Sequence, residues 1–487
     1  MTITISPQWQ GQLYSNGWRA ADGGVTDVVE PATGETLATV GLADASDVAA
    51  ACQRAAAAQT DWGLAVAEER APILRRAADL LEDRAEQVFE WVMRETGAVR
   101  SKAENELVDS VGEFREAAGL CTQPYGALLS STERRRLSMA QRVPLGVVGV
   151  ITPWNYPLIL AMRAVAPAIA LGNTVVLKPD VQTPVCGGLI IATVLEEAGL
   201  PEGVLHVLPG AAEAGEALVT DPNVRFVSFT GSSAVGRRVG ELGGKQLKKV
   251  SLELGGNNAL VVLEDADLEA AVSAGAWGSF LYQGQICLTT GRHLVHERIA
   301  RQYLDALTKY AEGLSVGDPW RDPHVALGPI INDRQLGRIE EIVTATVEAG
   351  AKVRTGATHD GRFYRPTVLE GVAPEMRAFT DEIFGPVAPV TTFSSEEEAL
   401  ALCNRSDYGL VAAIYTRRLG RGLELARAMK TGMVHINDTT NNDFPNVPFG
   451  GMGASGNGGR YGSLSNWEEF TQWQWVTLRD EPTRYPF

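Results

Sequence analysis

Hydrophobic positions follow two periods along this chain of 487 residues. Residues 43–63 and 71–96 repeat apolar positions at helical spacing, with Ser46 as the expected cap of the first helix. From residue 144, short apolar runs alternate with helical segments. The runs predict strands at 147–151, 174–177, 204–208 and 225–229. This alternation is typical of a parallel, doubly wound sheet, in which ligands bind at the carboxyl ends of strands.

A second alternation begins near residue 260. It predicts strands near Leu260–Leu263, Arg292–Val295 and Val387–Thr392, and hence a second α/β domain. The tail WEEFTQWQWVTLRD alternates aromatic and polar residues like an exposed strand. An isolated edge strand with three tryptophans invites pairing with another subunit. We therefore expect an α/β fold with two doubly wound parallel-sheet domains and a small β arm.

Composition narrows the functional class. The net charge of −16 argues against nucleic acid as a partner, and the Arg134–Arg136 cluster is interpreted as a solvated strand or turn. The start MTITISPQWQ lacks a basic region followed by an apolar stretch, so we expect no signal peptide. The most apolar region, residues 143–177, is interrupted by prolines and Arg163, which is unlike a membrane span.

The cysteines and histidines show no paired spacing. Five cysteines, at positions 52, 121, 186, 287 and 403, are odd in number and scattered, which favours a reducing cytoplasm over a disulfide framework. The six histidines form no metal-ligand pattern, so we expect no metal.

Five motifs together carry a family resemblance. They are TPWNYP at 152–157, FTGSSAVG at 229–236, LELGGNN at 252–258, QGQIC at 283–287 and EIFGP at 382–386. In this order and at these separations the chain resembles the aldehyde dehydrogenase superfamily over nearly its whole length. NYPLILAMRAVAPAIALGN, the GRH after the cysteine, and VHINDTT look most like its benzaldehyde, vanillin and salicylaldehyde members.

The resemblance implies a division of the chain. Residues 1–120 and 144–252 would form a dinucleotide-binding domain, and residues 253–460 a catalytic domain. Residues 121–143 and 461–487 would form an oligomerisation arm exchanged between subunits. A homodimer or homotetramer is therefore expected.

Aldehyde oxidation needs a nucleophile, and Cys287 matches the family's. A thiolate attacks the carbonyl carbon, whereas the thiol is a poor nucleophile. Cys287 follows Gln283-Gly284-Gln285, which we interpret as a flexible turn that lets the side chain project into a cleft. The other four cysteines are interpreted as small core residues.

The later steps need an oxyanion donor and a base. Asn155 lies at the carboxyl end of a strand, where its side-chain NH₂ and the Cys287 backbone N–H can donate to the oxyanion. Hydride then passes to the nicotinamide, and hydrolysis of the remaining thioester needs a general base. Glu253 is the only acid in an apolar, glycine-rich stretch, where partial burial would raise its pKa. It also favours water over coenzyme A as acyl acceptor.

Cofactor contacts are expected from the strand ends. Lys178 can hydrogen-bond ribose hydroxyls, and Gly231 and Ser232 open a helix whose N-terminus suits a pyrophosphate. The resemblance adds Ile151, Pro153, Trp154, Gly210, Gly215, Phe229, Val235, Gly236, Leu254, Glu382 and Phe384. The family commonly reads K-P-x-E where this chain has Val181 in place of the glutamate. We hypothesise that NAD is used and NADP tolerated.

The substrate pocket is expected to be aromatic and mostly apolar, which suits a flat ring aldehyde. Its candidate residues are Tyr156, Leu160, Arg163, Ile286, Leu288, Phe444 and Phe449. Arg163 either recognises a ring hydroxyl or is an ordinary helix cation. A semialdehyde or aliphatic substrate is the alternative, with Arg163 and Arg292 as the cations for an acidic group. A catalytically silent relative is a further alternative.

Near the C-terminus, Gly451, Gly453 and Gly456 spell G-x-G-x-x-G, the dinucleotide-binding fingerprint. A functional copy opens a βαβ unit, but only 31 residues follow Gly456, and they carry a strand pattern. We interpret these glycines as a loop passing close to the catalytic cleft, with Phe449 turned toward the substrate.

Overall fold

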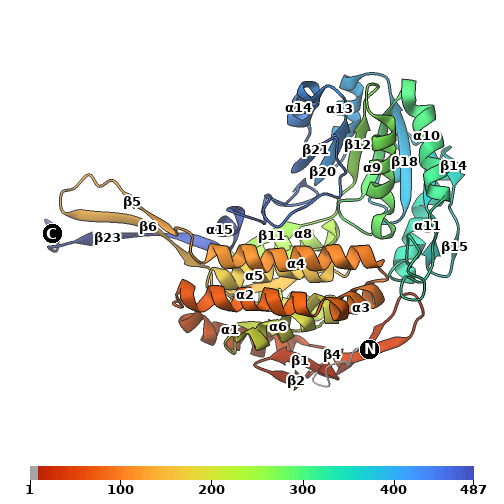
Figure 1. The fold of residues 1–487 in the computed structure, drawn as a ribbon. Coiled ribbons are helices and arrows are strands. Elements are labelled where there is room, and N and C mark those ends of the chain that lie inside the picture. Colours follow the sequence, from red (N-terminus) through yellow and green to blue (C-terminus); the bar gives the residue numbers. More distant parts are fainter. Residues whose placement is uncertain (1–8) are drawn as a thin grey trace.

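The structure, a computed structural model, describes residues 9–487. Its lower half in Figure 1 is built on a seven-stranded sheet in the order β11-β10-β7-β8-β9-β1-β2. The strands are β1 (Gln12–Ser15), β2 (Trp18–Ala20), β7 (Val147–Ile151), β8 (Thr174–Lys178), β9 (Leu205–Val207), β10 (Val224–Thr230) and β11 (Lys249–Glu253). Neighbours from β11 to β9 are parallel, which confirms the predicted alternation.

One edge of this sheet differs from the prediction of purely parallel strands. β1 and β2 pair antiparallel with each other, and β1 pairs antiparallel with β9. Only Asn16 and Gly17 separate β1 from β2, both with positive φ (56° and 87°). Such a two-residue turn forms a hairpin, whereas a parallel connection needs a crossover of about a dozen residues.

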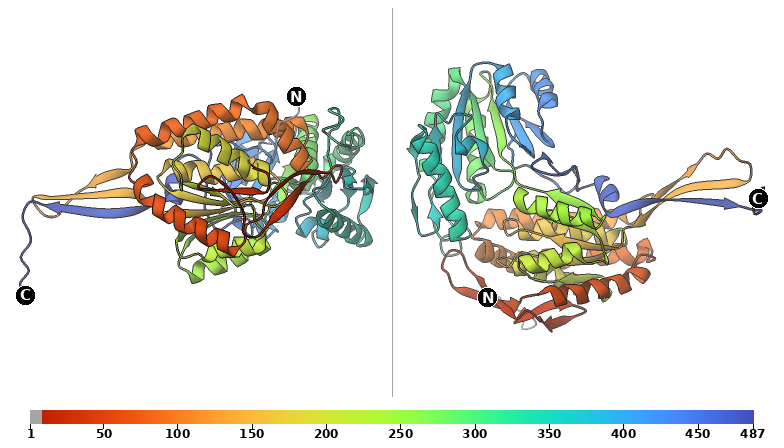
Figure 2. Two further views of the ribbon diagram at one scale, coloured as in Figure 1. Left: turned by 90° about the horizontal axis from the view of Figure 1, so that it is seen from below. Right: turned by 180° about the vertical axis from the view of Figure 1, so that it is seen from behind.

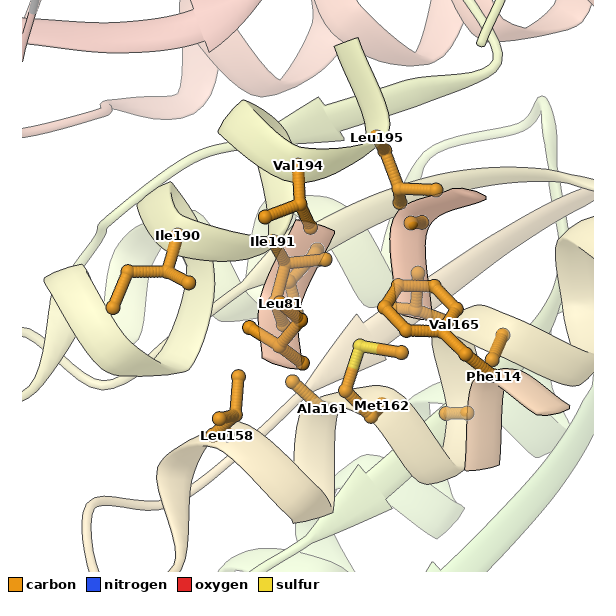
Figure 3. Packing of buried hydrophobic residues seen from close by; sticks show 14 of the residues in the cluster. Leu81, Phe114, Leu158, Ala161, Met162, Val165, Ile190, Ile191, Val194 and Leu195 are labelled. Atoms are coloured by element: carbon orange, nitrogen blue, oxygen red, sulfur yellow. The ribbon is translucent and has the colours of Figure 1, made fainter. Parts of the chain in front are cut away.

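Helices cover both faces of the sheet. On one face lie α1 (Ala45–Trp62), α7 (Ala212–Thr220) and α8 (Ser233–Lys245), and on the other α2 (Ala67–Asp83), α3 (Ala85–Thr96), α4 (Arg100–Leu120), α5 (Pro157–Ala170) and α6 (Ile190–Ala198). Val147 packs on the first face and Val148 on the second, as the alternation of side chains along a strand requires. Figure 3 shows Leu81, Phe114, Met162 and Ile191 converging in the second core, which fixes α5 beside the sheet.

Two details of the predicted helices are wrong. The helical stretch 71–96 is two helices, because the backbone at Arg84 leaves helical geometry (φ −103°, ψ 20°). The cap of α1 is Asp44 rather than Ser46, since Ser46 already lies inside the helix. The Asp44 carboxylate accepts from the backbone N–H groups of Ser46 (2.8 Å) and Asp47 (3.0 Å).

A second seven-stranded sheet, at the upper right of Figure 1, confirms the predicted second alternation. Its order is β14-β17-β18-β13-β12-β20-β21, and only β14 pairs antiparallel, at the edge. The strands are β12 (Asn258–Val262), β13 (Thr290–His296), β14 (Lys352–Thr355), β17 (Thr367–Glu370), β18 (Val387–Phe393), β20 (Val411–Tyr415) and β21 (Met433–Ile436). Its longer helices are α9 (Leu268–Phe280), α10 (Glu297–Glu312), α11 (Asp333–Glu348), α13 (Glu396–Asn404) and α14 (Leu419–Ala428).

A third sheet forms an arm that projects from the body (Figures 1 and 2). It consists of β5 (Gly126–Leu129), β6 (Arg136–Pro144) and β23 (Thr471–Arg479), in the order β23-β6-β5. The predicted tail strand is confirmed as an edge strand from Thr471 onward. Residues 467–470, which the alternation also placed in this strand, instead belong to the short helix α15 (Ser465–Phe470), so Trp467 is not part of it. Trp473 and Trp475 on β23 are 55% and 65% exposed.

The two large sheets meet at the carboxyl ends of the parallel strands of the first. The chain leaves β11 at Glu253 and enters β12 at Asn258, so residues 254–257 join the sheets. Any site at this edge draws on both sheets. Within residues 9–487, no helix is both long and apolar enough to cross a membrane.

Candidate active site

Cys287 follows a tight turn with a left-handed backbone. The turn η3 (Leu281–Gly284) continues from α9, and φ is positive at Tyr282 (48°), Gln283 (55°) and Gly284 (65°). A left-handed run is unfavourable for residues with a side chain and persists only where the surroundings over-determine it. Specific contacts with the surrounding protein must therefore hold this turn in its left-handed conformation.

Two buried glutamines supply those contacts. Gln283 Nε2 donates to the carbonyl oxygens of Gly97 (3.1 Å) and Pro329 (2.9 Å). Gln285 Oε1 accepts from the Ile331 N–H (3.0 Å), and both glutamines are 0% exposed. The interpretation of this turn as flexible is wrong. Its polar residues are buried because they bond to the backbone of distant segments, which local polarity does not reveal.

The segments that carry Asn155 and Cys287 touch directly. Asn155 follows β7, is 4% exposed, and donates from Nδ2 to the carbonyl oxygen of Gln285 (3.0 Å). Asn258 Nδ2, at the start of β12, donates to the carbonyl oxygen of Cys287 (2.8 Å). A Cβ on Gly256 would lie 2.4 Å from that same oxygen, so glycine is needed there. The Cys287 backbone is thus fixed by residues from both sheets.

Cys287 is partly exposed, and its surroundings raise the pKa of its thiol. Burial, and next the charge of Glu382, raise its pKa to about 12, while the charge of Arg163 acts in the opposite direction. The thiol is therefore protonated at neutral pH in the ligand-free chain. A nucleophilic role requires the proton to be removed when the site is loaded.

Glu253 ends β11 with a buried carboxylate, 3% exposed, so a solvent-facing position is excluded. Neither carboxylate oxygen has a hydrogen-bond partner in the part of the chain that is described. Burial raises its pKa well above the usual range, against the lowering effects of Arg460, Arg163 and the nearby Gly451 N–H, which lies outside hydrogen-bond geometry. The carboxyl lines a small cavity together with Leu160, Arg163, Ala164, Ser228, Thr230, Phe449 and Tyr461. A group with free oxygens and a raised pKa is suited to general base chemistry.

Arg163 is neither exposed nor an ordinary helix cation. It is 7% exposed on α5, pairs with Asp443, and has its Nε 3.5 Å from Glu113 Oε1. Its guanidinium also lies 4.2 Å from the Phe449 ring centroid. Burial raises the pKa of Glu113 to about 8, although the charge of Arg163 opposes this. The cation is therefore shared between two acids at the wall of the cavity.

Arg292 does not supply a second cation to the pocket. It is 3% exposed, and its guanidinium donates to the carbonyl oxygens of Asn257 (2.9 Å), Leu402 (2.9 Å) and Cys403 (3.1 Å). Its role is to join strand and helix ends, and its candidacy as a substrate-binding cation is wrong.

The other candidate substrate residues are placed differently from one another. Leu160 and Phe449 line the cavity with Glu253. Ile286 and Leu288 flank Cys287 and are buried, whereas Phe444 is 55% exposed. Tyr156 is half-buried and meets the Tyr282 ring edge to face, with centroids 5.7 Å apart.

Predicted cofactor residues gather at the strand ends of the first sheet. Lys178 Nζ donates to the carbonyl oxygens of Gly210 (2.6 Å) and Pro179 (3.2 Å), and burial lowers its pKa. Gly215 on α7 faces the Lys178 chain, and Ile151 and Phe229 lie at the ends of β7 and β10.

Helix α8 opens at this edge. Gly231 precedes it, and Ser232 caps it by accepting from the Val235 N–H (3.4 Å). A Cβ on Gly236 would lie 2.4 Å from Leu254 Cδ2, so the helix packs closely on the residue after Glu253. Val235 is 51% exposed. The first turn of a helix carries amides without intrahelical partners, so this end suits a phosphate, with an apolar surface beside it.

Glu382 and Phe384 approach from the second sheet. Glu382 Oε1 accepts from the Gly256 N–H (2.8 Å), and burial raises its pKa to about 7. Phe384 has φ 56° and meets the Trp154 ring edge to face, with centroids 5.5 Å apart. Pro153 and Trp154 form the bend before Asn155. This side of the site therefore combines an acid with aromatic edges.

The G-x-G-x-x-G segment opens no βαβ unit. Gly453 belongs to the short strand β22 (Met452–Gly453), which pairs with β19 (Tyr408–Gly409). Gly456 bridges Glu253, and the Ser455 carbonyl oxygen accepts from the Leu254 N–H (2.9 Å). The segment is a loop beside Glu253, and Phe449 lines the same cavity as Glu253.

Several site residues escaped sequence reasoning. Ser228 and Tyr461 share a hydrogen bond (2.8 Å) beside Glu253, and Asp443 and Glu113 hold Arg163. Asp443 ends the polar run NDTTNND at residues 437–443. An acid in this run was the only sequence signal for a partner of Arg163, the one cation of an otherwise apolar helix. The others carry no local signal.

Comparison with known proteins agrees with this geometry. The aldehyde dehydrogenase family model matches residues 18–476. Benzaldehyde dehydrogenase [NAD(+)] of Pseudomonas putida is 52% identical over 481 residues, with 99% of each chain covered. Vanillin dehydrogenase of an Amycolatopsis species is 52% identical over 488 residues, with 100% of each covered.

Solved structures show the same likeness. Betaine aldehyde dehydrogenase from Staphylococcus aureus, in complex with NAD⁺, superimposes with a TM-score of 0.94 at 30% identity, covering 98% of this chain and 96% of the other. The chain belongs to the aldehyde dehydrogenase family, and the resemblance drawn from its motifs is confirmed.

Proposed function

We propose that this chain oxidises aromatic aldehydes to carboxylates with NAD as cofactor and water as acyl acceptor. One observation carries the proposal. Where the two sheets meet, Asn155 is hydrogen-bonded to the segment that carries Cys287, and burial, together with the charge of the buried Glu253 carboxylate, helps to raise the pKa of the Cys287 thiol. The benzaldehyde and vanillin relatives support the aromatic substrate.

In the proposed mechanism, the Cys287 thiol loses its proton to solvent water, and the resulting thiolate attacks the aldehyde carbon. Asn155 Nδ2 and the Cys287 N–H donate to the oxyanion that forms. NAD, when bound, accepts the hydride. The acyl group remains on Cys287 as a thioester, and Glu253 removes a proton from the water that hydrolyses it.

The residues present fit a dinucleotide. The N-terminus of α8 offers amides for the pyrophosphate, exposed Val235 offers an apolar face for the base, and Lys178 lies at the end of β8, two strands along the same sheet edge. Glu382 and Phe384, opposite, would hold the nicotinamide side. We accordingly assign residues 1–120 and 144–252 to dinucleotide binding and residues 253–460 to catalysis.

The neutralised arginines favour an uncharged substrate. A semialdehyde with a carboxylate needs a cation, but Arg163 is shared between Asp443 and Glu113 and Arg292 binds backbone carbonyls. The apolar wall of Leu160 and Phe449 suits a ring.

A substrate panel tests the proposal. We expect kcat/KM for benzaldehyde, vanillin or salicylaldehyde to exceed that for succinic semialdehyde and hexanal by at least about tenfold, or roughly 1.4 kcal/mol. A higher value for either non-aromatic aldehyde would overturn the aromatic assignment. Absence of turnover with every aldehyde would favour a silent relative.

Cofactor choice depends on Val181. Without a glutamate there, a hydrogen bond to a 2′-hydroxyl and a repulsion against a 2′-phosphate are both absent. We expect NAD to be preferred and NADP to be used. A preference for NAD above about a thousandfold, roughly 4 kcal/mol, would refute this.

We also propose that residues 121–143 and 461–487 assemble subunits, giving a homodimer or homotetramer. The exposed tryptophans of β23 support this. Five free cysteines fit the cytoplasm as location.

A further inference from the structure

Lys102 is the most deeply buried cation near the proposed site that the mechanism leaves unused. It lies in the first turn of α4, and its side chain and that of Glu106, one turn later, are both 0% exposed. The two side chains form an ion pair. A buried lysine is rare unless something specific requires its charge.

The Lys102 ammonium faces two tyrosine rings. Nζ lies 4.2 Å from the centroid of Tyr156 and 4.6 Å from that of Tyr282. The rings meet edge to face, and the Tyr282 hydroxyl donates to the Thr96 carbonyl oxygen (3.1 Å). Cation–π attraction is strongest where, as here, the cation is desolvated.

These tyrosines stand beside the two residues proposed for chemistry. Tyr156 follows Asn155 directly and caps α5. Tyr282 begins the left-handed run that leads to Cys287. The Lys102 ammonium therefore contacts the segment that carries Asn155 and the segment that leads to Cys287. These two segments also contact each other directly, through the hydrogen bond from Asn155 Nδ2 to the carbonyl oxygen of Gln285.

Glu106 extends the connection to helix α5. Its Oε1 accepts from the N–H groups of Leu158 (2.8 Å) and Ile159 (3.4 Å), which are first-turn amides. Its other carboxylate oxygen meets Lys102. The pair is thus bonded to the start of α5 on one side and to both rings on the other.

We propose that Lys102 is a positioning residue that sets the oxyanion donor Asn155 against the nucleophile Cys287, through its simultaneous contacts with Tyr156 and Tyr282. The proposal rests on the function proposed above. Lys102 itself touches neither substrate nor cofactor.

Two variants separate charge from bulk. Lys102→Gln retains a donor toward Glu106 but removes the cation, whereas Lys102→Arg retains the cation. We expect the single-turnover rate of NADH formation with benzaldehyde to fall at least tenfold in Lys102→Gln and to stay within threefold of the unaltered enzyme in Lys102→Arg. The NAD dissociation constant should change less than threefold in both. Equal rates in the two variants would overturn the role of the charge.

A second readout is independent of turnover. Loosening the η3 turn should expose the Cys287 thiol further, so iodoacetamide should alkylate Cys287 at least threefold faster in Lys102→Gln, as followed by mass spectrometry without cofactor. An unchanged rate would contradict the proposal. This readout remains decisive if the enzyme oxidises no aldehyde, so failure of the proposed function and failure of the positioning role are distinguishable.

Glu95→Gln is the matched control for general destabilisation. Glu95 is as buried as Glu106, and it accepts hydrogen bonds from the first-turn N–H groups of Val185 (2.8 Å) and Cys186 (2.8 Å). The helix that these two residues begin carries none of the proposed catalytic residues. The Tm of Glu95→Gln should fall, while its rate of Cys287 alkylation should stay within threefold of the unaltered enzyme. If Lys102→Gln and Glu95→Gln accelerate alkylation alike, the effect is structural and the proposal fails.

Discussion

The surroundings of Glu253 suit a general base but lower the stability of the folded chain. The carboxylate is 3% exposed and lacks a hydrogen-bond partner within residues 9–487, so its ionised form is poorly solvated. A folded-state pKa above the unfolded value means that the folded chain binds more protons, and stability is lost as pH rises above the unfolded pKa. A catalytic base held in this way reduces the stability of the enzyme.

Glu253→Gln should therefore be more stable than the unaltered enzyme at pH 8, by on the order of 1 kcal/mol. The gain should shrink strongly toward pH 4, where the folded carboxyl group is protonated and the unfolded one is largely protonated. Denaturant unfolding at both pH values measures this. The same variant should retain the first turnover of NADH formation and lose steady-state turnover at least about a hundredfold. An equal stability difference at both pH values would contradict the burial argument.

Gly256 tests how closely the backbone must approach Cys287. An alanine Cβ would meet the Cys287 carbonyl oxygen at 2.4 Å, and a backbone atom cannot yield as a flexible side chain can. We expect Gly256→Ala to lower kcat about a hundredfold, because small displacements at a reacting centre are costly. Gly337→Ala is the control: it lies within α11 with open space around its Cβ, and should stabilise the chain by about 0.5–1 kcal/mol. Equal kcat losses in both variants would refute this reading.

At the scale of elements, periodicity predicted more than motifs did. The parallel strands β7, β8, β9 and β10 and the helices between them follow from alternating apolar runs, because buried parallel strands leave continuous hydrophobic stretches. The antiparallel pairing of β1 with β2 did not follow, because it depends on a two-residue turn rather than on periodicity.

Site contacts were predictable only where a motif carried them. Cys287, Asn155 and Glu253 stand in recognisable motifs, whereas Arg163 is held by Asp443, 280 residues away in sequence. The buried pair Lys102 and Glu106 has the i, i+4 spacing of a solvent-exposed helix pair. Local spacing cannot distinguish these cases, because burial is decided by what packs against the helix.

The late glycine loop gives a prediction at the element scale. Gly453 has φ 63°, and a Cβ there would lie 2.5 Å from the Asp407 carbonyl oxygen. Gly453→Ala should shift β22 and with it the backbone that meets Glu253, reducing turnover or folding. NAD affinity, measured by fluorescence titration, should stay within a few-fold. A selective collapse of NAD binding would show that the loop serves the cofactor after all.

At the scale of the whole molecule, the arm is the part least explained by a single chain. β23 and β6 pair over nine residues, yet Trp473 and Trp475 on β23 remain more than half exposed. Large apolar side chains gathered on a projecting edge mark an interaction surface.

Replacing both tryptophans by glutamate should therefore reduce the molar mass in solution, measured by light scattering, to that of a smaller assembly. Trp277→Glu is the matched control, because Trp277 is 44% exposed on α9, away from the arm. An unchanged mass in the double variant would remove the arm from the assembly.

In the proposed function, Cys287 carries the acyl group of an aromatic aldehyde. Rapid mixing of the enzyme with NAD and benzaldehyde, followed at the NADH absorbance, tests it most directly. We expect a burst approaching one NADH per subunit, absent from Cys287→Ala. A burst that survives in Cys287→Ala would contradict it.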